Sequence, residues 1–123
     1  MQKNYSERLD FQESDSFNLP DFTITYLGRY KVTRGPQIPF VYADYELKAE
    51  DEKMIISYTS GAGIIGPDYF ELGGKKWILD PLMFKGAMTI YPFDQYDGPA
   101  KPGRSKINRD YTKNAIEIED LGK

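Results

Sequence analysis

The feature that most constrains the fold of this chain is a pair of segments in which apolar and polar residues alternate, separated by a short polar turn. Val41–Lys48 and Lys53–Thr59 flank residues 49–52, which read Ala-Glu-Asp-Glu. If Lys48 faces Lys53, every pair on one face of the hairpin is apolar, and these pairs are Leu47 with Met54, Tyr45 with Ile56 and Ala43 with Tyr58. A slip of one residue would turn that whole set toward water, so the sequence favours this register. The acidic turn itself is most simply a solvated hairpin tip.

A second hairpin is predicted around Gly73-Gly74. Glycine pairs adopt the positive φ angles that a two-residue hairpin turn requires. The turn aligns an aromatic pair and an opposite-charge pair, each worth about 0.2–1 kcal/mol relative to alanine. The strands are Tyr69–Leu72 and Lys75–Leu79, and the pairs are Phe70 with Trp77 and Glu71 with Lys76.

Alternation between apolar and polar residues also begins after Asp21. One parity carries β-branched and aromatic side chains, which is typical of a half-buried strand. Gly28 interrupts this apolar series, and a bulge or bend there is expected to split the run into two strands. Further strands are predicted at Phe84–Tyr91 and Ala115–Glu119. The apolar series consists of Phe22, Ile24, Tyr26, Tyr30 and Val32.

Short strands with a turn signal every 8–12 residues favour an all-β fold, a single small antiparallel sandwich or barrel of about seven strands. The 123 residues suit one domain. We expect a polar N-terminal segment at 1–20 with at most one short helix and a β-sheet core at 21–91. An exposed, Pro/Gly-rich and locally basic loop at 92–114 and a final strand with the C-terminus at 115–123 complete the organisation.

The absence of histidine and cysteine excludes several chemistries. Without cysteine there is no disulfide framework, thiolate nucleophile or cysteine-type zinc site. Without histidine there is no Ser-His-Asp triad and no imidazole base. We therefore predict no catalytic residue, no metal site and no cofactor, and a chain that is not an enzyme.

No apolar stretch long enough for a signal peptide or a membrane span is present in the sequence. A cytoplasmic location is the default prediction. The alternative is a secreted or periplasmic protein whose leader has been removed.

One segment matches the pattern G-x-G-x-x-G, from Gly61 to Gly66. The string resembles the phosphate-binding turn of flavin- and nicotinamide-binding Rossmann proteins, in which a helix follows the third glycine. Here only six residues separate Gly66 from Gly73, too few for the helix of a βαβ crossover. The sequence therefore predicts a glycine-rich loop between two strands.

The same loop supplies a candidate interaction surface. Ile64 and Ile65 are adjacent apolar residues in a segment bounded by glycine and proline, and exposed there they would anchor a partner. The alternative is that both close one end of the core. Tyr42 joins the surface because the predicted register turns it away from the apolar face, and Asp68 follows the loop.

Two weaker signals lie near the C-terminus. Residues 99–114 carry basic side chains interleaved with a tyrosine, but the acidic balance, with 16 basic and 19 acidic residues and a net charge of −3, argues against nucleic-acid binding. Asp94–Gly98 resembles part of a calcium loop without its spacing, and a type I turn is the plainer interpretation.

Three functions remain open at this level. The favoured one is a protein-interaction module, such as an inhibitor, adaptor or immunity-type factor, whose partner is another protein; edge strands could also form a homodimer. The alternative is a barrel or sandwich that binds an apolar or carbohydrate ligand. A carboxylate- or tyrosine-based enzyme is the least favoured. The aromatic residues considered for the ligand pocket are Tyr26, Tyr30, Phe70 and Trp77.

Overall fold

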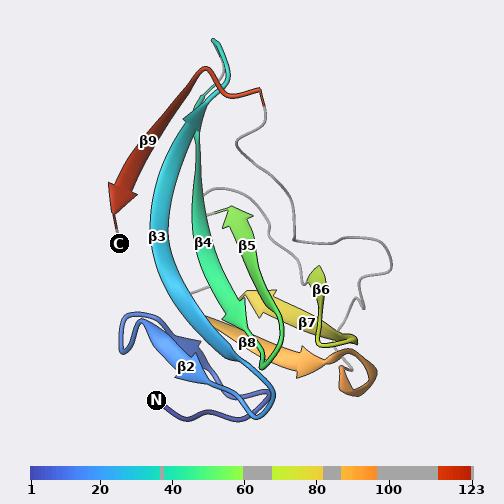
Figure 1. Ribbon diagram of the computed structural model, residues 1–123. Coiled ribbons are helices and arrows are strands. Elements are labelled where there is room, and N and C mark those ends of the chain that lie inside the picture. Colours follow the sequence, from blue (N-terminus) through green and yellow to red (C-terminus); the bar gives the residue numbers. More distant parts are fainter. Residues whose placement is uncertain (37, 60–67, 82–86, 97–113, 123) are drawn as a thin grey trace.

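The chain forms two antiparallel sheets that pack together as a sandwich-like all-β domain (Figure 1). The computed structural model describes residues 1–36, 38–59, 68–81, 87–96 and 114–122. The predicted all-β class is confirmed.

The first sheet contains the predicted long hairpin. Its strands are β2 (Ser16–Asn18), β3 (Thr23–Thr33), β4 (Phe40–Lys48) and β5 (Lys53–Thr59), with β9 (Glu117–Gly122) added beside β3. Lys48 pairs with Lys53 and Leu47 with Met54, so the predicted register is confirmed. The alternation of apolar and polar residues explains this register, because no other register keeps the apolar side chains on the core face.

The second sheet has the order β1 (Leu9–Asp10), β8 (Ala87–Pro92), β7 (Lys75–Pro81) and β6 (Asp68–Leu72). Phe70 pairs with Trp77 across the β6–β7 hairpin, as predicted. Gly73 and Gly74 have φ angles of 64° and 74°, the left-handed conformation of a two-residue hairpin turn. The predicted strand at 84–91 is present from Ala87; residues 82–86 lie outside the described part of the chain.

Gly28 forms a bulge, but the strand does not divide there. The pairing with β4 steps from Tyr26–Tyr45 to Gly28–Asp44 within one continuous strand. Gly28 has a φ of 129°, which lets the extra residue enter without breaking the ladder. The predicted split into two strands is therefore wrong.

The bulge reverses which side chains of β3 face the core. Cross-strand partners share a face of the sheet. Before the bulge, Ile24 pairs with the core residue Leu47; after it, Val32 pairs with Phe40, which has the opposite parity on β4. The apolar series expected on one face thus serves both faces of the sheet.

The core draws on the first twenty residues far more than their polar composition suggested. Leu9 and Phe17 are completely buried, and Phe11 and Leu19 nearly so. Phe17 pairs with Ile24 through β2. Residues 1–20, for which at most one short helix was predicted, are all described and contribute the strands β1 and β2. The polar residues between these apolar ones face outward, which hid the pattern.

The region 92–114, predicted as an exposed loop, is described only at its ends. Pro92 ends β8 and a single 3-10 turn, η1, covers Phe93–Gln95. Tyr96 is buried, with its ring centroid 5.2 Å from that of Tyr91, so the prediction of exposure is wrong at that residue. Most of the basic stretch lies outside the described residues. The final strand, predicted at Ala115–Glu119, is present as β9, which begins at Glu117 and extends to Gly122.

Candidate functional site

Of the four residues predicted as an interaction surface, the structure describes the side chain of Tyr42 alone. Tyr42 is 5% exposed, so its predicted exposure is wrong. Ile64 and Ile65 lie outside the described residues, and their role stays a prediction. Asp68 begins β6, where its backbone lies opposite Leu79.

The bulge at Gly28 in β3 contributes to the burial of Tyr42. The reversed parity of β3 places Tyr30 directly opposite Tyr42, with the ring centroids 5.7 Å apart. Arg34 Nη1 donates a hydrogen bond of 3.3 Å to the Tyr42 hydroxyl. Burial raises the pKa of the Tyr30 hydroxyl. The contacts of Tyr30 and Tyr42 are therefore those of packed residues within the fold.

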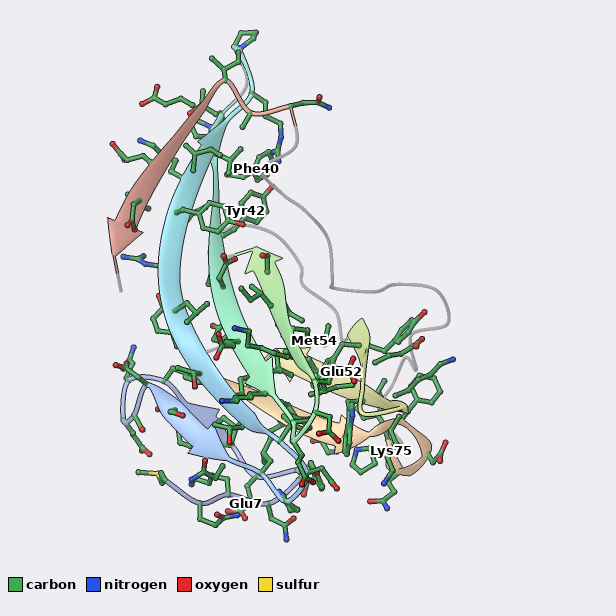
Figure 2. All side chains as sticks on the ribbon, in the orientation of Figure 1. Glu7, Phe40, Tyr42, Glu52, Met54 and Lys75 are labelled. Carbon is green, nitrogen blue, oxygen red and sulfur yellow. The ribbon has the colours of Figure 1, made fainter. Side chains whose placement is uncertain are left out.

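A surface groove of about 480 Å³ lies where the turns of the two hairpins meet. Its apolar lining comes from Phe22, Leu72 and Trp77, all of which are nearly buried. Its walls carry four carboxylates and one ammonium group. Figure 2 labels Glu52 and Lys75, which line the groove from the β4–β5 and β6–β7 hairpins. The carboxylates belong to Asp21, Glu50, Asp51 and Glu52.

A hydrogen bond between the sheets holds the groove together. The Gly73 backbone N–H donates to Glu52 Oε2 at 2.8 Å. The Ala49 N–H donates to the Glu52 carbonyl at 2.8 Å and closes the tip of the β4–β5 hairpin. The acidic turn is thus attached to the glycine turn of the other sheet, and its predicted role as a simple solvated tip is incomplete.

The opposite wall is fixed by Tyr5. Its hydroxyl donates to the Asp21 carboxylate, and the Asp21 N–H donates back to that hydroxyl at 3.2 Å. The Tyr5 ring centroid lies 5.0 Å from that of Trp77, whose indole N–H donates to the Leu72 carbonyl at 3.1 Å. Burial, followed by the hydrogen bond to Asp21, raises the pKa of the Tyr5 hydroxyl. The phenol therefore stays protonated and keeps this contact at physiological pH.

The electrostatics of the groove favour a cation. Three of its carboxylates lie in consecutive exposed residues, Glu50, Asp51 and Glu52, and Lys75 supplies the one positive charge among the lining residues. Sequence patterns could not reveal this site, because Asp21 and the two turns are distant in the chain. Only the packing of the sheets brings them together.

The aromatic residues considered for a ligand pocket do not converge. Phe70 is completely buried and Trp77 is 3% exposed. The bulge separates the other two, because Tyr26 pairs with the core residue Tyr45 while Tyr30 pairs with Tyr42 on the opposite face. Within the described ranges, no three acidic side chains are grouped so that they could hold a metal ion.

Asp80 provides a pH-dependent prediction for stability. Burial raises the pKa of this carboxyl, so ionised Asp80 opposes folding; its stabilising contribution is present below the unfolded pKa and is lost as pH rises through the folded pKa. Asp80→Asn should therefore raise the melting temperature at pH 7. The gain should vanish at the lowest pH at which both proteins fold, and an equal gain at both pH values would contradict this assignment.

The chain is thus a sandwich-like all-β domain with an acidic groove between two hairpin turns, which are joined by the Gly73–Glu52 hydrogen bond. Comparison with models of known families, with curated proteins and with solved structures finds no match. Among the described residues there is no helix with the length and apolarity to cross a membrane.

Proposed function

We propose that this chain is a non-enzymatic protein-interaction module that docks a positively charged segment of a partner protein in the acidic groove. The observation that carries the proposal is the groove itself, whose lining includes four carboxylates and only one ammonium group. Arginine and lysine side chains fit such a site, because their charged heads meet carboxylates in charge-assisted hydrogen bonds.

Hydrogen bonds that position two of the groove's carboxylates support the same function. Glu52 is held by Gly73 and Asp21 by Tyr5. A site already ordered before binding loses less conformational freedom when the partner arrives. The two carboxylates at the hairpin tip, Glu50 and Asp51, are exposed and accessible to a partner.

A small-molecule ligand is the second candidate. The volume of about 480 Å³ falls within the range of about 300–1,000 Å³ that is usual for small-ligand sites. The nearly complete burial of Phe22 and Trp77, which are 4% and 3% exposed, leaves little aromatic surface for a ligand to cover. The geometry therefore favours a protein segment over an apolar or carbohydrate molecule.

Charge reversal at the groove tests the function. The double variant E50K/D51K should bind the partner about tenfold more weakly, because each exposed charge contributes modestly and both contributions change sign. The matched control is E13K/E117K, which makes the same charge change at two exposed residues that do not line the groove. The partner is first captured from a lysate of the source cells. Titration with the captured protein then measures the affinity of each double variant for it.

Two outcomes would contradict the groove as the docking site. One is retention of the partner by E50K/D51K, and the other is equal loss in the control. A third variant, I64D/I65D, tests the predicted loop surface separately. Loss of binding in that folded variant alone would move the interface to the loop.

A further inference from the structure

β9 lies on the edge of the first sheet with almost none of its surface buried. Five of its six residues are exposed, and Leu121 is half-buried. Ile118 is 50% exposed although it pairs with the fully buried Val32. Figure 1 shows β9 as the outermost strand on this side, alongside β3. The strand therefore adds little to the core.

Backbone pairing with β3 is what holds this strand. The register runs from Arg29–Gly122 to Thr33–Glu117, and one ion pair joins Lys31 Nζ to Glu119 Oε2 at 3.2 Å. Both charged side chains are well exposed, at 39% and 50%, and exposed pairs contribute little. Elements with few buried contacts open at low free-energy cost, so β9 is a strand that can leave its place.

The edge that β9 covers requires a strand. Residues Arg29–Val32 of β3 pair with β4 on their other side. Removal of β9 would leave their outward N–H and C=O groups without a partner, which is a template for another strand. The β9 of a second copy matches this template in full, since it restores the Val32–Ile118 neighbours and the Lys31–Glu119 ion pair.

We propose that β9 is exchanged between two copies of this chain, each strand pairing with β3 of the other copy to form a dimer. The alternative dimer, in which two β9 strands meet along their outer edges, is disfavoured by charge. Glu117, Glu119 and Asp120 of one copy would approach the same residues of the other, and like charges across a strand pair are destabilising. Exchange replaces one established strand pairing with an identical one and creates no such repulsion.

Complementary charge variants test the exchange. In K31E alone and in E119K alone, β3 and β9 carry like charges whether or not they exchange. In a 1:1 mixture, the exchanged heterodimer instead places the new carboxylate of the K31E copy beside the new ammonium group of the E119K copy. Its other exchanged pairing joins the unaltered Lys31 to the unaltered Glu119. We expect the heterodimer to be about fivefold more abundant in the mixture than either homodimer in its own solution. Native mass spectrometry distinguishes these species.

The double variant K31E/E119K is the matched control. It restores the opposite-charge pair within each chain, so it should dimerise like the wild-type protein. Circular dichroism verifies that every variant is folded. A mixture no more dimeric than its components, or a heterodimer equally abundant when wild-type protein replaces one variant, would overturn the proposal.

Discussion

Replacing Phe17 by alanine is expected to lower the free energy of unfolding by about 3–5 kcal/mol, the usual loss for a large aromatic side chain removed from a core. Phe17 is completely buried. Its ring contacts Phe11 edge-on, with centroids 5.0 Å apart, and its backbone pairs with Ile24. The substitution leaves a cavity between the N-terminal segment and the first sheet.

Urea denaturation of the wild-type and F17A proteins measures this loss. Phe40→Ala is the control, because Phe40 is 47% exposed and its truncation should cost less than about 1 kcal/mol. Equal effects of the two substitutions would show that residues 1–20 are not an integral part of the fold.

Gly28→Val should destabilise the protein by about 1–3 kcal/mol, the range for a residue held in a sparsely populated backbone conformation. The φ angle of 129° at Gly28 is disfavoured for any residue with a Cβ, and most strongly for a β-branched one. If the backbone relaxes to a regular strand, the bulge is lost and Val32 turns from its buried position toward the other face.

The matched control is Leu27→Val, next to the bulge glycine in the same strand and 43% exposed. Thermal unfolding of both variants separates backbone strain from β-branching in general. A G28V protein as stable as L27V would mean that the bulge does not depend on glycine at this position.

The local sequence pattern was sufficient to predict the registers of the two hairpins, but it did not predict the pairing that follows the bulge in β3. The β4–β5 and β6–β7 registers follow from residues close in the chain, where alternation and a glycine turn leave one arrangement. The glycine within the alternating run predicts the bulge at Gly28 but not its effect on the following residues. One extra residue reverses the parity of the rest of β3 and so brings Tyr30 opposite Tyr42. Tyr42 was expected to be exposed on that face and is instead buried against Tyr30.

Tertiary contacts hid the N-terminal strands and the groove from sequence reasoning. Leu9 and Phe17 stand among polar residues in strands of two and three residues, too short for a period to emerge. The groove depends on Asp21, Glu52 and Gly73 meeting across two sheets. No local signal in the sequence specifies that approach.

The most direct test of the docking function is an NMR titration of the 15N-labelled protein with the peptide acetyl-Gly-Arg-Gly-Arg-Gly-amide at low salt. The groove should respond first, through the Gly73 amide and the Trp77 indole N–H, because both residues line it. Salt at about 0.5 M should weaken the response, since it screens exposed charges beyond a few ångströms. The E50K/D51K protein should need about tenfold more peptide for the same shifts, and E13K/E117K should respond like the wild-type protein. Shifts spread evenly over the surface, or unchanged in E50K/D51K, would contradict a docking groove for a positively charged segment.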